Sequence, residues 1–232
     1  MADAKIIVAL DYSSCEDALA LVDQLHPSAC KLKVGKELFT HAGPGMVKTL
    51  IERGYDVFLD LKFHDIPNTT AKAVRAAAEM GVWMTNIHAL GGSRMMTQAK
   101  QALQECGSDM LLIGVTVLTS MDDSDLRESG VERNVAEQVL HLARAAQVAG
   151  LDGVVCSAQE AKALKGHCGH DFLLVTPGIR LADGATDDQR RVVTPVDAVA
   201  MGSDYLVIGR SITESRSPLA TLQQINQSLV IA

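Results

Sequence analysis

The sequence predicts an α/β fold, a single (β/α)8 barrel of the TIM type that spans residues 1–232. Eight short apolar runs alternate with eight helical patterns, and no linker-like stretch divides the 232 residues. Hydrophobic residues make up 47% of the chain and aromatic residues only 3%, a composition typical of parallel sheets. Strict alternation favours parallel strands joined by right-handed crossovers. Eight units in this length fit a closed barrel better than the alternative, an open doubly wound sheet.

The apolar runs predict the strands. The clearest follows Gly54 and continues with the branched and aromatic side chains of Tyr55–Leu59, which are typical of strands. In chain order the predicted strands are Ile6–Leu10, Cys30–Val34, Tyr55–Leu61, Val82–His88, Met110–Val117, Gly153–Cys156, Phe172–Val175 and Tyr205–Ile208.

Helical patterns lie between these strands. Ser14 is placed to cap the first of them, and Asn68-Thr69-Thr70 can cap the third after a turn that Pro67 ends. Beyond the alternation itself we find no sequence repeat. The predicted helices are Ser14–Leu25, Pro44–Arg53, Thr69–Met80, Ser93–Cys106, Val135–Ala149, Ser157–Lys165, Thr194–Met201 and Pro218–Val230.

The composition bounds the class of protein. A net charge of −7 argues against a nucleic-acid surface, although a local cluster of cations can still hold an anionic substrate. The five cysteines are odd in number and form no Cys-x-x-Cys, which indicates reduced thiols in a cytosolic protein. Asp3 and Lys5 precede the first strand, so we expect no signal peptide. No apolar run approaches the roughly 20 residues of a membrane span. We therefore expect a cytoplasmic protein without nucleic-acid or membrane partners.

Residues 60–65, Asp-Leu-Lys-Phe-His-Asp, end the third predicted strand with three alternating charges. Side chains alternate along a strand, so Asp60 and Lys62 are expected on one face. An acid and an amine on a buried strand are unfavourable unless they pair and serve a purpose. Barrels place their chemistry at the carboxyl ends of the strands, so Asp60, Lys62 and Asp65 are candidate catalytic residues. His64 lies on the exit turn and has at most an orienting role.

Other strands also end in polar residues. Asp11 closes the first, where a helix cap is the alternative interpretation. Lys31 and Lys33 lie two apart on the second, and a solvated Lys33 is the alternative there. The fourth ends at Asn86 and His88, and His88 is interpreted as a core histidine. The fifth ends at Thr116, Thr119 and Ser120.

The last two strands predict a phosphate site. Ile208-Gly209-Arg210-Ser211 places a cation and an expected helix start after the eighth strand, where barrels often hold phosphate. The long polar loop 178–191 carries Arg180 and Gln189 and is interpreted as a lid over a phosphate, with a surface insertion as the alternative. The run His167-Cys168-Gly169-His170 is expected in a helix-to-strand loop at the opposite end, and we assign no metal to it.

The residues together resemble a known family. Asp60-x-Lys62-x-x-Asp65, continued as Ile66-Pro67-Asn68-Thr69, is similar to the signature of orotidine 5′-phosphate decarboxylases. Five further blocks run in order from the first strand to the last: Val8-Ala9-Leu10-Asp11, Leu32-Lys33-Val34-Gly35, Val117-Leu118-Thr119-Ser120, Thr176-Pro177-Gly178-Ile179-Arg180 and Ile208-Gly209-Arg210.

This resemblance implies a homodimeric barrel that converts orotidine 5′-monophosphate to uridine 5′-monophosphate and CO₂, the last step of de novo pyrimidine biosynthesis, without metal or organic cofactor. It implies a charged network of Lys33, Asp60, Lys62 and Asp65, with Lys62 as proton donor and with Asp65 and Thr69 reaching the neighbouring subunit's site. The implied substrate contacts are Asp11 and Lys33 on the ribose, Thr119 near the pyrimidine, and Arg180, Gln189, Gly209 and Arg210 on the phosphate. Ile66, Ser120 and Pro177 complete the expected substrate-binding set.

Two other functions remain open at this stage. Mg²⁺-dependent sugar-phosphate decarboxylases and synthases of the same suprafamily share Asp-x-Lys-x-x-Asp, but they look as though they need an acid at the position of Lys33. A lysine there would repel a divalent ion, which disfavours this alternative. A phosphonucleotide-binding barrel without activity is expected to lack one member of the charged set, and all four are present.

Overall fold

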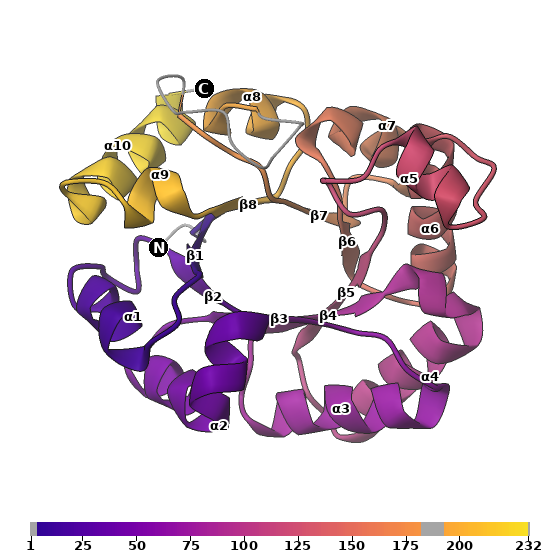
Figure 1. Cartoon of the computed structure of the whole chain (residues 1–232), viewed down its shortest axis with the longest axis horizontal. Helices are drawn as coiled ribbons and strands as arrows, with labels where there is room; N and C mark the ends of the chain where they lie inside the picture. Colours follow the sequence, from indigo (N-terminus) through magenta and orange to yellow (C-terminus); the bar gives the residue numbers. More distant parts are fainter. Residues whose placement is uncertain (1–3, 182–192, 232) are drawn as a thin grey trace.

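A closed parallel barrel forms the centre of the protein. The computed structural model describes residues 4–181 and 193–231. Its strands hydrogen-bond to their neighbours in chain order, and the last pairs with the first, which confirms the predicted (β/α)8 barrel (Figure 1). The strands are β1 (Ile6–Leu10), β2 (Lys31–Gly35), β3 (Val57–Phe63), β4 (Met84–His88), β5 (Leu111–Val115), β6 (Gly153–Val155), β7 (Leu173–Thr176) and β8 (Tyr205–Ile208).

The helices form an outer ring around the strands (Figure 1). Short helical segments that the sequence did not predict occur at 89–91 and 123–128. The elements are α1 (Cys15–Val22), α2 (Lys36–Glu52), α3 (Pro67–Glu79), η1 (Ala89–Gly91), α4 (Gly92–Glu105), α5 (Asp123–Glu128), α6 (Val135–Val148), α7 (Ala158–Cys168), α8 (Pro195–Ala200), α9 (Arg210–Thr213) and α10 (Pro218–Ile231).

The helix starts show where local sequence rules held. The side chain of Ser14 accepts the backbone N–H of Asp17, as the predicted cap requires. The predicted cap at Asn68-Thr69-Thr70 is wrong, because α3 begins at Pro67, whose fixed φ suits the first helical position. Helix α2 begins at Lys36 rather than at Pro44. It is broken at Gly43 (φ 63°, ψ −167°), and the predicted Pro44 start marks the half that follows the break.

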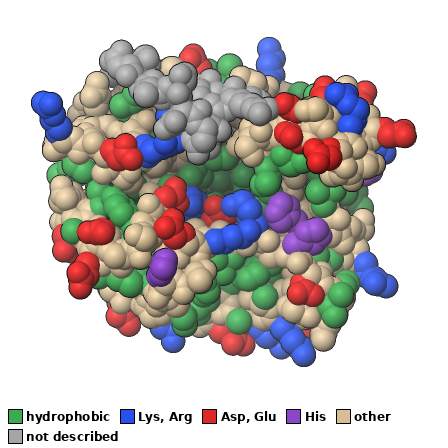
Figure 2. Space-filling model, in the orientation of Figure 1, with side chains coloured by type: hydrophobic (Ala, Val, Ile, Leu, Met, Phe, Trp, Pro, Cys, Tyr) green, Lys and Arg blue, Asp and Glu red, His purple; other side chains and the backbone are tan. Residues whose placement is uncertain are grey.

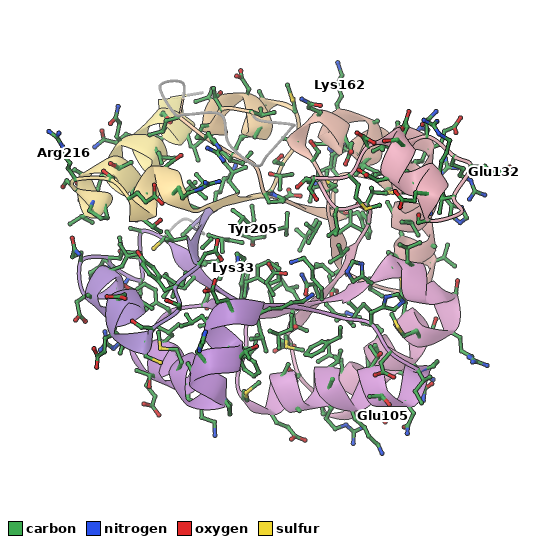
Figure 3. The ribbon with its side chains drawn as sticks, in the orientation of Figure 1. Lys33, Glu105, Glu132, Lys162, Tyr205 and Arg216 are labelled. Atoms are coloured by element: carbon green, nitrogen blue, oxygen red, sulfur yellow. The ribbon has the colours of Figure 1, made fainter. Side chains whose placement is uncertain are left out.

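The barrel has an apolar interior and a second apolar layer beneath the helices. Inward-facing side chains from six strands fill the lower part of the ring, as in other (β/α)8 barrels. Figure 3 shows Lys33 and Tyr205 within the ring of strands. The cavity described below rests on this interior layer. The interior layer consists of fully or nearly buried residues: Ile7, Ala9, Phe58, Met84, Ile113, Val175 and Val207.

Two equivalent clamps tie strands together at the amino end of the barrel. Asp152, just before β6, accepts the Lys100 ammonium at 2.7 and 2.8 Å and the Leu112 backbone N–H at 2.8 Å. Asp204, just before β8, accepts Lys165 and the Leu174 N–H, both at 2.7 Å. In each clamp the carboxylate accepts both the ammonium of a helix lysine and the N–H of the second residue of the preceding strand. This end of the barrel is therefore built for stability.

Candidate active site

A cavity of about 560 Å³ opens at the carboxyl ends of the strands. Its volume lies in the usual range for a small-molecule site. In Figure 2 acidic and basic side chains gather in the hollow at the mouth of the barrel. The residues that line it are Ala9, Asp11, Tyr12, Lys33, Phe58, Asp60, Lys62, Val115, Val117, Leu118, Thr119, Val155, Pro177, Gly178, Ile179, Arg180, Val207, Gly209, Arg210, Ser211, Thr213 and Glu214.

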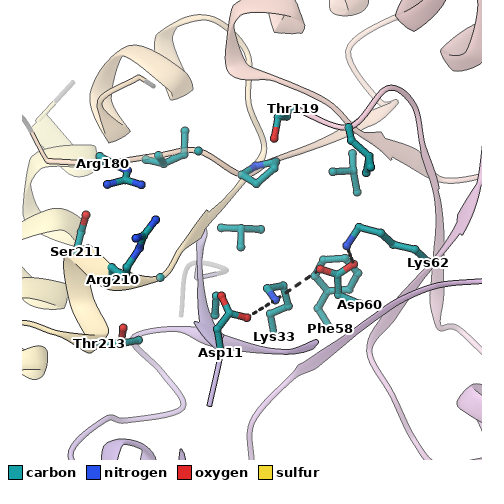
Figure 4. A pocket seen from close by; sticks show the side chains of 18 of the residues that line it. Asp11, Lys33, Phe58, Asp60, Lys62, Thr119, Arg180, Arg210, Ser211 and Thr213 are labelled. Carbon is teal, nitrogen blue, oxygen red and sulfur yellow. Dashed lines mark hydrogen bonds and ion pairs between the residues drawn. The ribbon is translucent and has the colours of Figure 1, made fainter. Parts of the chain in front are cut away.

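Two lysines converge on one buried carboxylate at one side of this cavity (Figure 4). The Lys62 ammonium donates to Oδ1 of Asp60 at 2.5 Å, and the Lys33 ammonium lies 3.6 Å from Oδ2. Lys33 also donates to Asp11 at 3.0 Å. Only 12% of the Asp60 side chain is exposed, so this charge depends on the two cations around it. The structure brings together Asp11, Lys33, Asp60 and Lys62, whereas Asp65, the fourth member of the charged network that the resemblance implies, is exposed and lies apart.

Asp60 stays ionised in this setting. Burial by itself would raise its pKa, but Lys33, Lys62 and the hydrogen bonds from Lys62 and Asn86 outweigh it and lower the pKa below the ordinary value. The carboxylate is therefore a fixed negative charge at neutral pH. A charge-assisted hydrogen bond to such a carboxylate holds an ammonium in one position.

The end of β3 departs from a regular strand. The sequence argument placed Asp60 and Lys62 on one face by simple alternation, and the two do meet. They meet at an irregular stretch, because the register between β3 and β4 shifts between Leu59 and Phe63 and Lys62 has φ 52°. A left-handed backbone is unfavourable by about 1–2 kcal/mol for a residue with a Cβ atom. The strain is one more indication that the direction of Lys62 matters.

Two guanidinium groups lie at the other side of the cavity. Arg180 follows β7 and Arg210 opens α9, and both side chains point into the hollow (Figure 4). Gly209 lines the cavity beside them, with Ser211 and Thr213. A helix does start at Arg210 as expected, but α9 has only four residues, so the guanidinium groups rather than a helix dipole attract an anion here.

The base of the expected lid is closed by the backbone. Ile179 and Val193 form an isolated bridge, and the Arg180 N–H donates to the Val193 carbonyl at 3.1 Å. Most of the predicted lid, including Gln189, lies outside the described residues. Pro177, just before the predicted lid, and Arg180, near its start, line the cavity.

Four predicted site residues do not line the cavity of this chain. Ile66 is 67% exposed, and Asp65, Thr69 and Ser120 are exposed as well. Oδ1 of Asp65 accepts the Ile66 backbone N–H at 2.6 Å instead of meeting Lys62. The acid–amine–acid order that the sequence suggested is thus not assembled within one chain. The side chains of Asp65, Ile66 and Thr69 face outward.

Sequence reasoning missed Asn86. It was noted at the end of the fourth strand but not placed in the site. The structure buries it completely and bonds its amide to Asp60 at 2.7 Å. Lys31, grouped with Lys33 by spacing, lies instead at the amino end, 2.6 Å from Asp56 and over the Trp83 ring. Knowledge of how β2 pairs with its neighbouring strands would have placed Lys31 at the amino end of the barrel and Lys33 nearer the carboxyl end.

The histidines differ in part from expectation. His88 is half-buried beside His64, with ring centroids 5.5 Å apart, rather than in the core. Burial, then His64, Lys62 and Lys36, lower the His88 pKa to about 4, so it is neutral at pH 7. His167 and Cys168 are not in a loop, because α7 extends to Cys168. Within the described ranges no three His, Cys, Asp or Glu residues gather as metal ligands would.

Comparisons with known proteins agree with the geometry. The family model "Orotidine 5'-phosphate decarboxylase / HUMPS family" matches residues 4–225. Proteins named orotidine 5′-phosphate decarboxylase are 60% identical in Vibrio parahaemolyticus (99% of both chains) and 60% identical in Glaesserella parasuis (98% of this chain, 99% of that one). The crystal structure of that enzyme from Lactobacillus acidophilus superposes with a TM-score of 0.87 at 41% identity, over 98% of this chain and 99% of that one. The chain belongs to the orotidine 5′-phosphate decarboxylase family.

Proposed function

We propose that this chain decarboxylates orotidine 5′-monophosphate to uridine 5′-monophosphate and CO₂, with Lys62 as the proton donor and no metal or organic cofactor. The observation that carries the proposal is the Lys62 ammonium held at 2.5 Å by the buried carboxylate of Asp60, in a cavity that also receives Arg180 and Arg210. This is a carboxy-lyase reaction that completes pyrimidine biosynthesis.

The chemistry requires a fixed cation beside the reacting carbon. When the bond from C6 to the carboxylate breaks, CO₂ leaves and the electron pair remains on C6 in the plane of the ring. Ring π-resonance cannot spread that pair. The Lys62 ammonium stabilises the developing charge and then transfers a proton from Nζ to C6. The neutral amine then regains a proton from water.

Asp60 and Lys33 support that step. Asp60 holds the Lys62 ammonium in place, and Lys33 offsets the charge of the Asp60 carboxylate from the other side at 3.6 Å. We also expect the substrate carboxylate to bind near Asp60. The ribose hydroxyls are assigned to Asp11 and Lys33, and the pyrimidine edge to Thr119.

The phosphate is assigned to Arg180, Arg210 and Gly209. A guanidinium group binds phosphate through two parallel hydrogen bonds, and two of them line this side of the cavity. Gln189 is proposed to close over the same group. The phosphate is remote from C6, so its binding energy can orient the pyrimidine and raise turnover as well as affinity.

A second copy of the chain completes the proposed site. Asp65 and Thr69 are exposed next to the 67% exposed Ile66, and none of them lines the cavity of its own chain. We propose a homodimer in which Asp65 of the partner lies on the far side of Lys62 from Asp60. Ile66 and Thr69 would contact the substrate held by the other copy. Ser120 would contact the substrate held by its own chain.

The proposed enzyme is one catalytic domain over residues 1–232, located in the cytoplasm. No helix in the described part of the chain is long and apolar enough to cross a membrane. Its partners are a small-molecule substrate and its own second copy, without nucleic acid.

The second candidate is a Mg²⁺-dependent sugar-phosphate decarboxylase or synthase. The family model carries a second name besides the decarboxylase, whereas the 60% identical relatives carry the decarboxylase name alone. Lys33 lies 3.0 Å from Asp11 and 3.6 Å from Asp60, so an ammonium already occupies the space between the two carboxylates. A divalent cation would have to displace it against its charge.

A spectrophotometric assay tests the proposal. Purified protein is mixed with orotidine 5′-monophosphate, and the ultraviolet change on loss of the carboxylate is followed with and without EDTA. We expect turnover that EDTA leaves unchanged, and loss of turnover by at least about 10³-fold in Lys62→Ala. The matched control is Lys72→Ala, which removes an exposed lysine from α3. Inhibition by EDTA would favour the magnesium alternative, and substantial turnover in Lys62→Ala would assign the proton donor elsewhere.

A further inference from the structure

Strand β3 carries a bulge that faces a single residue of β4. Leu59 pairs with Thr85 and Phe63 pairs with Ile87, so residues 60–62 lie opposite residue 86 alone. Extra residues in one strand break the regular ladder and re-aim the side chains they carry. Here the re-aimed side chains belong to Asp60 and Lys62.

Asn86 fills the gap that this bulge leaves. It is fully buried, and its Oδ1 accepts the Lys62 backbone N–H at 2.7 Å while its Nδ2 donates to Oδ1 of Asp60 at 2.7 Å. The orientation of the amide is determined by its partners, because a backbone N–H needs an acceptor and a carboxylate needs a donor. One side chain thus bonds to the backbone of Lys62 and to the carboxylate that holds the Lys62 ammonium.

The backbone of Lys62 depends on that bond. In residues 4–181 and 193–231 it is the only non-glycine residue with a positive φ, 52°. Such a conformation persists only where the surroundings over-determine it. Thr85 fixes the strand just before the bulge by donating to the Leu59 carbonyl at 2.9 Å, but Asn86 is the residue bonded to Lys62 itself.

We propose that Asn86 is a positioning residue for the proton donor: it holds the bulge so that the Lys62 ammonium and the Asp60 carboxylate keep the geometry that proton transfer needs. The inference rests on the proposed function and goes beyond it, since Asn86 itself does not line the cavity. Its role is to fix direction, so its loss reduces the rate of the chemical step more than the binding of substrate.

Two substitutions separate the bonds of the amide. Asn86→Leu removes both bonds at similar volume and leaves the Lys62 N–H without this acceptor. Asn86→Asp keeps an acceptor for that N–H but places a second carboxyl against Asp60. Two adjacent carboxyls cannot both ionise easily, so the introduced group has a raised pKa. While it is protonated it can donate to Asp60 as the amide does; once ionised it repels Asp60.

The experiment measures kcat and KM from pH 5 to 9, with folding checked by circular dichroism. We expect Asn86→Leu to lower kcat by about 10²-fold, the effect of a misplacement of roughly 1 Å, with KM changed by less than about threefold. We expect Asn86→Asp to show a new ionisation, with kcat that rises as pH falls and approaches that of the parent. Thr116→Val is the matched control, since it removes a buried side-chain bond to a neighbouring strand, 2.8 Å to the Val155 carbonyl, away from the bulge.

Each outcome decides the proposal. A kcat of Asn86→Leu within twofold of the parent, or an equal loss in Thr116→Val, overturns it. If Asn86→Leu does not fold, the Asn86→Asp profile decides alone: the new ionisation supports the positioning role, and a profile parallel to that of the parent refutes it. Failure of the unsubstituted protein to decarboxylate orotidine 5′-monophosphate would instead refute the proposed function, so the two failures are distinguishable.

Discussion

Substitution of Asp152 tests how the clamp stabilises the amino end of the barrel. Asp152→Ala removes the acceptor of the Leu112 N–H, and a buried N–H without a partner is destabilising by about 1–3 kcal/mol. It also removes the ion pair between Asp152 and Lys100, in which the Lys100 side chain is 17% exposed and the Asp152 side chain 28% exposed. A pair of this intermediate burial contributes about 1–2 kcal/mol, between surface and buried values. The free energy of unfolding should fall by about 2–5 kcal/mol, which for a chain of this size lowers Tm by about 4–20 °C.

Urea and thermal unfolding followed by circular dichroism, at one protein concentration, measure this loss. Asp152→Asn keeps an oxygen for the Leu112 N–H and removes only the charge, so it should lose about half as much. Asp204→Ala, at the equivalent clamp, should match Asp152→Ala because its carboxylate makes the same two kinds of bond. Decarboxylation should be unchanged at 25 °C, since the clamp lies at the end away from the cavity. A loss below about 0.5 kcal/mol in Asp152→Ala, or equal losses in the alanine and asparagine variants, would refute the reasoning.

Three further outcomes are expected. Arg210→Ala should lower kcat at saturation as well as raise KM, because phosphate binding orients the ring; steady-state kinetics showing a change in KM alone would contradict this. The pKa of His88 is lowered to about 4, so between about pH 6.5 and 4 the unfolded chain binds a proton at this residue and the folded chain does not. The free energy of unfolding therefore falls as pH drops from 6.5 to 4. Allowing for its partial exposure this loss is about 1–2 kcal/mol, and urea titrations should show a shallower acid slope in His88→Gln than in the parent. Gly153→Ala should destabilise by about 3 kcal/mol, since its Cβ would lie 2.2 Å from the Leu173 carbonyl oxygen; an unchanged urea midpoint would exclude that clash.

The sequence predicted the barrel because its signals are local. Strands β1 and β8 match their predicted bounds, since short continuous apolar runs indicate buried strands without knowledge of their neighbours. The charged residues at the carboxyl ends also followed, because parallel strands must end at the same face. The break in α2 could be seen only as a start at Pro44, since residues 36–42 carry no cap that marks an earlier start.

What the sequence could not supply depends on how strands pair and how the turns between elements are built. The bulge at Lys62 exists because three residues of β3 but only one of β4 lie between the pairs Leu59–Thr85 and Phe63–Ile87. The sequence of either strand alone does not contain that information. Asn86 acquires its role from the bulge and was missed for the same reason. The outward direction of Asp65 was missed as well, because it depends on the turn in which its carboxylate accepts the Ile66 N–H.

The bridge between Ile179 and Val193 has a consequence for how such a barrel can diversify. The chain departs and returns at one point, so the intervening residues form an excursion whose ends are already joined. Doubling the length of an excursion of this kind changes its closure entropy by only about 0.6 kcal/mol. Arg180 lies at the joined end, beside the cavity. Insertions or deletions between the two bridged residues can therefore change the length of the chain there while Arg180 keeps its place at the cavity.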